Sequence, residues 1–180
     1  GMQIPLGIHN EEVRTGAWTE VRDPGRLTEV VGTVANASPE QVDLAVRAAH
    51  GAYGKWRHVD VEERADLLLK AADVLEREAG ELAVVLSRET GAILPACRGE
   101  IGAAVRVLRS TADLVRDFFR PKQTEDEQSW VSLEKRPLGV VAAIIPWNAP
   151  VILMVQKLAP ALAAGNAIVI KPSPNAPIAV

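Results

Sequence analysis

The sequence contains little of the chemistry that disulfide scaffolds and metal centres need. Cys97 is the single cysteine among 180 residues, which excludes an internal disulfide framework and any metal site built from cysteines. The three histidines, His9, His50 and His58, lack the spacing of metal ligands. We therefore expect no metal site, and the scarcity of cysteine fits a reducing, cytoplasmic location.

An excess of charge of one sign is also absent. The chain carries 20 Lys and Arg against 23 Asp and Glu, which gives a net charge of −3, and no block of like charge occurs. Proteins that bind nucleic acid or anionic membranes concentrate positive charge on one surface. We therefore expect neither as a partner.

No stretch of the sequence suits a membrane span. Residues 137–156 carry no charged side chain and are nominally long enough to cross a bilayer. Gly139, Pro146 and Pro150 interrupt this stretch and would leave backbone groups without hydrogen bonds in lipid. The stretch divides more naturally into a strand and a helix.

The first residues resemble no targeting signal. Residues 3–14 lack the basic start and the long apolar stretch of a secretory signal, and Gly1 ahead of Met2 is typical of a residue left by tag cleavage. With 48% hydrophobic residues, the chain has enough apolar material for one core, or for one domain with an appendage.

The N-terminal half predicts a hairpin followed by helices. Short strand patterns at 18–24 and 30–35, joined by Asp-Pro-Gly-Arg, are typical of a β-hairpin. Ser38, with Gln41 three residues later, fits a capping box at the start of a helix that ends near Gly54.

Two further helical patterns follow. One begins at Asp60, and Gly80 is expected to divide it; its predicted inward residues are Leu67, Leu68, Ala71, Val74 and Leu75. The next has the clearest apolar stripe in the chain, made of Cys97, Ile101, Ala104, Val105, Leu108, Ala112, Val115 and Phe119. Because Cys97 lies on this stripe, the pattern favours a packed, inert thiol over a nucleophile.

The C-terminal third predicts a strand, a helix and a second strand. Residues 121–128 are polar and without a period, so we expect a surface connection, and 129–136 alternate as a strand does. From Gly139 the sequence GVVAAII predicts a strand that is buried on both faces. The helix at 151–164 and the apolar strand AIVIK then complete a crossover, which makes the two strands parallel.

The side chains that can do chemistry follow these two strands. Pro146, Trp147 and Asn148 come after the first strand, and Lys171 and Ser173 stand at the end of the second. Ligands bind beyond the carboxyl ends of parallel strands, so we expect both loops to face one crevice. The Asn148 amide is a donor suited to an oxyanion, and the Lys171 ammonium suits sugar hydroxyls or a phosphate.

Simpler interpretations of these residues remain open. Asn148 stands just before Pro150 and is equally well placed to cap the following helix. On the residues alone, a lysine in the position of Lys171 is more often the solvated end of a strand than a ligand. Trp56 and Trp130 are expected to pack in the core.

Residues 136–173, RPLGVVAAIIPWNAPVILMVQKLAPALAAGNAIVIKPS, closely resemble the aldehyde dehydrogenase superfamily. The resemblance continues upstream through 32–57 and 63–91. Its most specific features are the Pro-Trp-Asn and Lys-Pro-Ser signatures, which one crossover separates.

The resemblance implies an α/β fold. It corresponds to the N-terminal part of the aldehyde dehydrogenase fold, with helices packed on the start of a parallel, Rossmann-like sheet. Extended segments at 18–35 and 128–136 are candidates for oligomerisation strands, so a homo-oligomer is expected. The implied division is residues 2–120 (hairpin and helices), 121–137 (connection and oligomerisation strand) and 138–180 (start of the dinucleotide-binding sheet).

The resemblance also implies a reaction. In this family a cysteine attacks an aldehyde to form a thiohemiacetal, hydride passes to NAD or NADP, and water releases the carboxylic acid. By resemblance, Asn148 holds the thiohemiacetal oxygen, and Lys171, with Ser173 nearby, approaches the adenosine ribose. The other cofactor contacts that the resemblance implies are Ile144, Ile145, Pro146, Trp147 and Pro174.

The sequence departs from the family in three respects. Many NAD-preferring members carry a glutamate three residues after the lysine, where this chain has Pro174, so we expect NADP to be tolerated or preferred. Ala149 stands where several members place a bulky aromatic residue, which suggests room for a wider aldehyde. The family's nucleophilic cysteine and general-base glutamate lie beyond Val180, so we expect no turnover from this chain alone. The alternatives are a non-catalytic assembly or binding module and, within the same fold, a CoA-acylating or phosphate-reducing relative.

Overall fold

The computed structural model describes residues 2–180, and the interpretation of Gly1 lies outside these residues. The helices are α1 (Pro39–Trp56), α2 (Val61–Thr90), α3 (Leu94–Phe118) and α4 (Pro150–Ala163). The strands are β1 (Met2–Ile4), β2 (Leu6–Ile8), β3 (Glu11–Val13), β4 (Trp18–Asp23), β5 (Arg26–Ala35), β6 (Lys122–Glu125), β7 (Trp130–Leu133), β8 (Val140–Ile144) and β9 (Ala167–Lys171).

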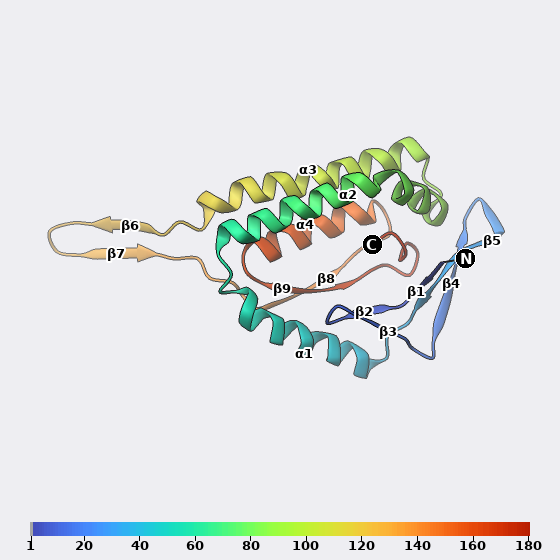
Figure 1. Ribbon diagram of the computed structural model, residues 1–180, viewed down its shortest axis with the longest axis horizontal. Helices are drawn as coiled ribbons and strands as arrows, with labels where there is room; N and C mark the ends of the chain where they lie inside the picture. The colour runs from blue at the N-terminus through green and yellow to red at the C-terminus, as the bar shows by residue number, and fades with distance from the viewer. Residues whose placement is uncertain (1) are drawn as a thin grey trace.

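Strands β8 and β9 lie between two layers of helices (Figure 1). Helices α2, α3 and α4 lie on one side of this pair, and α1 lies on the other. The strands are parallel, with Val140 opposite Ala167 and Ile144 opposite Lys171. The α/β architecture and the predicted strand, helix, strand crossover are therefore confirmed.

The main hydrophobic core lies among α2, α3 and α4. The predicted stripe of α3 is buried from Cys97 to Val115, and Phe119 packs against it partly buried. Because an apolar period of this kind is a local property of one helix, the sequence was sufficient to find it.

Helix α2 differs from the prediction in two ways. It runs unbroken through Gly80, since one glycine inside a helix costs only about 1 kcal/mol relative to alanine. Its buried line includes Ala65, Leu68 and Ala72, whereas Leu67, Ala71 and Val74, which were predicted to point inward, are exposed. Small side chains allow two helices to approach closely. Helix α3 packs against the face of α2 that carries Ala65 and Ala72.

The helix ends follow the turn chemistry of the sequence. Ser38 and Gln41 form the predicted capping box of α1, although the helix continues to Trp56, two residues beyond Gly54. Asp60 caps α2 by accepting a hydrogen bond from the Glu62 backbone N–H. Gly91 ends α2 in the left-handed region at a φ of 75°, which glycine adopts without steric cost.

Within residues 2–180 three antiparallel hairpins accompany the helices, and the first of them pairs β2 with β3. β4 and β5 pair antiparallel as predicted, and β1 adds to β5 in parallel. The β6–β7 hairpin projects from the body (Figure 1). The connection predicted at 121–128 is exposed, but it contains strand β6, which the sequence did not indicate because β6 is exposed on both faces and shows no apolar alternation. Trp130, predicted to pack, is 60% exposed on this hairpin.

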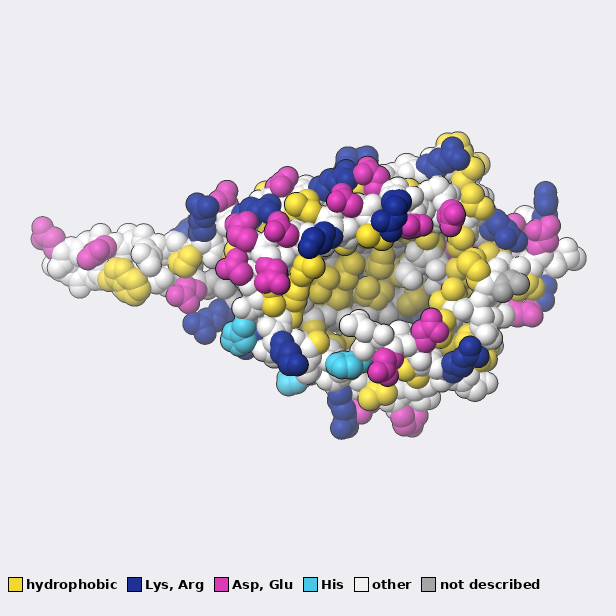
Figure 2. All heavy atoms as spheres, viewed as in Figure 1, with side chains coloured by type: hydrophobic (Ala, Val, Ile, Leu, Met, Phe, Trp, Pro, Cys, Tyr) yellow, Lys and Arg dark blue, Asp and Glu magenta, His cyan; other side chains and the backbone are white. Residues whose placement is uncertain are grey.

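Strand β8 is buried on one face only. Ala143 and Ile145 are buried, whereas Ile144 between them is 73% exposed, so the prediction of two buried faces is wrong within residues 2–180. Successive strand residues point to opposite faces of the sheet. Helix α1 packs on the face that carries Ile144 but does not cover Ile144 itself. Figure 2 shows apolar side chains gathered in a hollow between α2 and α1. Among residues 2–180, no helix has the length and hydrophobicity needed to cross a bilayer.

Candidate active site

The two loops that carry the predicted site residues leave the same edge of the sheet. Ile144 and Lys171 are register partners at the carboxyl ends of β8 and β9. Just beyond them, the Ile145 N–H donates to the Lys171 carbonyl at 3.0 Å. Residues 146–148 and 172–174 therefore emerge side by side.

Polar groups at this edge are available to a ligand. The side chains of Asn148 and Lys171 are exposed, and within residues 2–180 neither makes a hydrogen bond or an ion pair with another side chain. Trp147, which stands between Pro146 and Asn148 in the chain, is 58% exposed. This edge presents an amide, an ammonium and an indole to solvent without competing partners.

Two of the predicted contacts are turned inward. Ile145 is 2% exposed, so its side chain packs in the core and only its backbone can face a ligand. Ser173 is buried, and its Oγ accepts a hydrogen bond from the Asn175 N–H at 3.2 Å. Pro174, the next residue, is exposed. Ser173 thus shapes the loop after Lys171.

A left-handed residue separates Asn148 from α4. Ala149 is the N-cap residue of α4, at φ 51° and ψ 52°, and no side chain of its own segment caps the helix. The interpretation of Asn148 as the cap is therefore wrong. A left-handed conformation costs a residue with a Cβ roughly 1–2 kcal/mol, so the surrounding structure must hold this turn.

Glu100 of α3 supplies the cap that α4 lacks. Its Oε1 accepts hydrogen bonds from the backbone N–H groups of Val151 at 2.8 Å and Ile152 at 3.3 Å. Sequence reasoning missed this residue. No local signal could have found it, because Asn148 was available as a candidate cap and the true partners lie 51 and 52 positions apart.

Glu89, near the end of α2, holds the segment after β9 in the same way. Its two carboxylate oxygens accept from the N–H groups of Ile178 at 2.8 Å and Ala179 at 2.9 Å. Burial raises the pKa of Glu89 above its ordinary value, and the charge of Glu100 adds to this effect, although the two amides oppose it. Glu100 of α3 thus anchors the segment that follows β8, and Glu89 of α2 anchors the segment that follows β9.

Cys97 is buried, as predicted from its position on the apolar stripe of α3. It is 1% exposed, and its Sγ lies 3.8 Å from the Ala92 carbonyl oxygen. Burial, with the nearby charge of Glu100, raises the pKa of the thiol. A thiol that is buried and kept protonated is a poor nucleophile.

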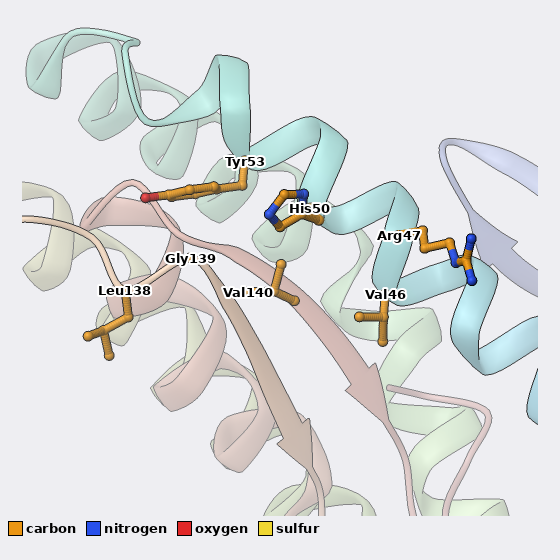
Figure 3. Close-up of a pocket in the computed structure, with 7 residues that line it drawn as sticks. All are labelled: Val46, Arg47, His50, Tyr53, Leu138, Gly139 and Val140. Atoms are coloured by element: carbon orange, nitrogen blue, oxygen red, sulfur yellow. The ribbon is translucent and has the colours of Figure 1, made fainter.

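One pocket lies away from this edge. It is formed where α1 faces the beginning of β8, near the amino ends of the strands (Figure 3). Its lining residues are Val46, Arg47, His50, Tyr53, Leu138, Gly139 and Val140. It includes none of the predicted site residues.

Comparison with known proteins decides the family. The sequence model of the Aldehyde dehydrogenase family matches residues 12–180. The chain belongs to the aldehyde dehydrogenase family. The resemblance inferred from the Pro-Trp-Asn and Lys-Pro-Ser signatures is thereby confirmed.

Two curated aldehyde dehydrogenases illustrate the relationship. The chain is 37% identical over 169 residues to the alpha-ketoglutaric semialdehyde dehydrogenase of Bacillus subtilis (strain 168), a match that covers 92% of this chain and 35% of that protein. It is 35% identical over 187 residues to the NADP/NAD-dependent aldehyde dehydrogenase PuuC of Escherichia coli (strain K12), covering 97% of this chain and 37% of that protein. The chain therefore spans little more than a third of these relatives.

Solved aldehyde dehydrogenases share the fold. The NADP-dependent glyceraldehyde-3-phosphate dehydrogenase of Bacillus halodurans C-125, solved as a complex with NADP, superimposes with a TM-score of 0.94 at 28% identity. That match covers 99% of this chain and 39% of the other. The expected fold, the N-terminal part of the aldehyde dehydrogenase fold, is confirmed.

Proposed function

We propose that the protein oxidises an aldehyde to a carboxylic acid with NAD or NADP as the hydride acceptor. The observation that carries the proposal is the exposure of Asn148 and Lys171 at the same carboxyl edge of β8 and β9 in a chain of this family. The names of the relatives support the reaction class, since both are aldehyde dehydrogenases.

Asn148 is the candidate catalytic residue of this chain. When a nucleophile attacks an aldehyde carbon, negative charge develops on the carbonyl oxygen. A donor already held toward that oxygen stabilises the transition state, and the exposed Asn148 amide is such a donor. Cys97 is buried and has a raised pKa, so we propose that the attacking thiol is not Cys97.

The edge also fits a nicotinamide dinucleotide, which accepts hydride from the substrate when bound. The Lys171 ammonium would donate to hydroxyls of the adenosine ribose. Ile144 and Trp147 offer exposed apolar surface for a ring, and Pro146 and the backbone of Ile145 complete that wall. Ser173 contributes by fixing the loop.

Pro174 bears on the choice between the two cofactors. The position is exposed and offers no carboxylate to repel the 2′-phosphate of NADP. We propose that NADP is tolerated or preferred, and the Escherichia coli relative is named as dependent on NADP or NAD. Comparing kcat/KM for NAD and NADP in the complete protein tests this, and Pro174→Glu should shift the ratio toward NAD. Strong NAD selectivity before substitution would contradict it.

Substitution of Asn148 tests the reaction itself. The complete protein that carries this chain is assayed with short aliphatic and aromatic aldehydes by the absorbance of the reduced cofactor. Asn148→Ala should lower kcat by roughly 100-fold or more, as removal of one oxyanion donor does. Asn175→Ala, at an exposed asparagine beyond Lys171, is the matched control and should leave kcat unchanged. Equal kcat in both variants, or no cofactor reduction with any aldehyde, would refute the proposal.

The β6–β7 hairpin favours a second role, assembly. Trp130, Val131 and Leu133 are exposed on it, and a projecting two-stranded ribbon offers unpaired backbone edges. We propose that it pairs with a second copy of the protein, which would be a cytoplasmic homo-oligomer. Light scattering of wild type and Trp130→Asp tests this. An unchanged molar mass would contradict it, whereas oligomers without dehydrogenase activity would favour a non-catalytic assembly module.

A further inference from the structure

The start of α4 depends on a side chain from another helix. The first backbone N–H groups of a helix have no partner within it. In α4, Pro150 has no N–H, and Val151 and Ile152 donate to Glu100. Leu153 then begins the helical ladder by donating to the Ala149 carbonyl at 3.2 Å. Glu100 therefore satisfies the donors that precede the ladder.

The charge of Glu100 also suits its place. The amino end of a helix carries partial positive charge, and α4 has no acidic residue of its own in its first turn. Glu100 belongs to α3, and the nearby α3 residues Cys97 and Ile101 are buried in the core. The carboxylate is thus attached to a rigid support and fixes the first turn of α4 against it.

The turn held in this way is the one that presents Asn148. Only Ala149, in its left-handed conformation, and Pro150 stand between Asn148 and the two amides that Glu100 binds. A strained turn persists when the structure on either side determines it. β8 determines one side, through the pairing of Ile144 with Lys171. Glu100 determines the other.

We propose that Glu100 is a positioning residue, which directs the Asn148 amide toward the substrate oxygen by holding the first turn of α4. This inference rests on the proposed function of Asn148. Glu100 itself touches neither substrate nor cofactor. It should therefore affect kcat through Asn148 while leaving KM for the cofactor nearly unchanged.

Three variants of the complete protein test the proposal. Glu100→Ala removes the acceptor and should lower kcat roughly 10- to 100-fold, because a small misplacement of a catalytic group is costly. Glu100→Gln should retain most of kcat, because both amides bind the same oxygen, Oε1, which glutamine keeps. Glu89→Ala removes an equivalent carboxylate from Ile178 and Ala179, and kcat should not change.

A double-mutant cycle separates positioning from general loss of stability. If Glu100 acts through Asn148, Glu100→Ala should reduce kcat no further when Asn148 is already alanine. Additive effects in the cycle, or equal losses of kcat in Glu89→Ala and Glu100→Ala, would overturn the proposal.

A measurement without turnover keeps this test distinct from the test of the reaction. In the 180-residue chain, Glu100→Ala should speed amide hydrogen exchange at Val151 and Ile152 and move the NMR signals of the Asn148 side-chain amide. Glu89→Ala should leave these signals in place. Unmoved Asn148 signals in Glu100→Ala would refute the positioning role, whereas an inactive wild-type protein would refute only the proposed reaction.

Discussion

The indole Nε1 of Trp56, the last residue of α1, donates to the backbone carbonyl of Leu162 in the last turn of α4 at 3.0 Å. The neighbouring carbonyl, that of Ala163, accepts from Nε of the buried Arg64 at 2.9 Å. The last carbonyls of a helix need partners from outside it. Side chains from α1 and α2 thus complete one end of α4, and Glu100 of α3 completes the other.

Trp56→Phe should lower the free energy of unfolding by roughly 0.5–1.5 kcal/mol, because it removes the indole hydrogen bond to the Leu162 carbonyl, which keeps the Gly165 N–H as a donor. Trp130→Phe, on the exposed face of the β6–β7 hairpin, should change it by less than about 0.5 kcal/mol. Urea unfolding followed by circular dichroism measures both. Equal losses would show that the hydrogen bond contributes nothing.

The raised pKa of Glu89 should appear in the pH dependence of stability. Between the ordinary value of 4.5 and the raised value, the folded state binds more protons at Glu89 than the unfolded state does. The stability of wild type relative to Glu89→Gln should therefore fall as pH rises through this interval and then level off. Other carboxyl groups, such as Glu40 with its lowered pKa, contribute to both proteins and cancel in the difference. A difference that rises with pH would contradict the prediction.

Ala149→Gly should raise the free energy of unfolding by roughly 0.5–1 kcal/mol, because glycine adopts the left-handed conformation without the cost that a Cβ imposes. Ala164→Gly is the matched control, at a φ of −75° in the right-handed region, and should lower it by roughly 0.5–1 kcal/mol. Chemical denaturation of the two variants measures both changes. Loss of stability in both would show that Ala149 is not strained.

Cys97 should resist thiol reagents in the folded protein, because it is buried and its pKa is raised. Labelling with a disulfide reagent should proceed at the rate of unfolding and become fast in denaturant. For the same reason, the 180-residue chain alone should reduce neither NAD nor NADP in the presence of an aldehyde. Fast labelling together with cofactor reduction that Cys97→Ser abolishes would reverse this conclusion.

The elements that the sequence predicted correctly are those whose pattern is local. The α3 stripe, the Ser38 capping box and the β8–α4–β9 crossover each express a period or a turn within a short window. These features were enough to place Asn148 and Lys171 at one edge of the sheet.

The features that the prediction missed depend on distant partners or on solvent. Trp56 and Trp130 are the same residue type, yet only Trp56 meets a carbonyl, and that carbonyl is 106 positions away. The role of Glu100 likewise arises from tertiary packing of α3 on α4. The β6 strand has no apolar face to reveal it, since water covers both sides.

The projecting β6–β7 hairpin is the segment of chain that connects the part with α1–α3 to the part with β8, α4 and β9. The hydrophobic core also joins these two parts, through side chains along the whole of α4. A protease that cuts the exposed turn at 126–129 would therefore yield two fragments that remain bound to each other. The larger would keep Glu100 and the smaller Asn148. This protein could then be reconstituted from two separately expressed pieces, with its candidate active-site edge rebuilt by association.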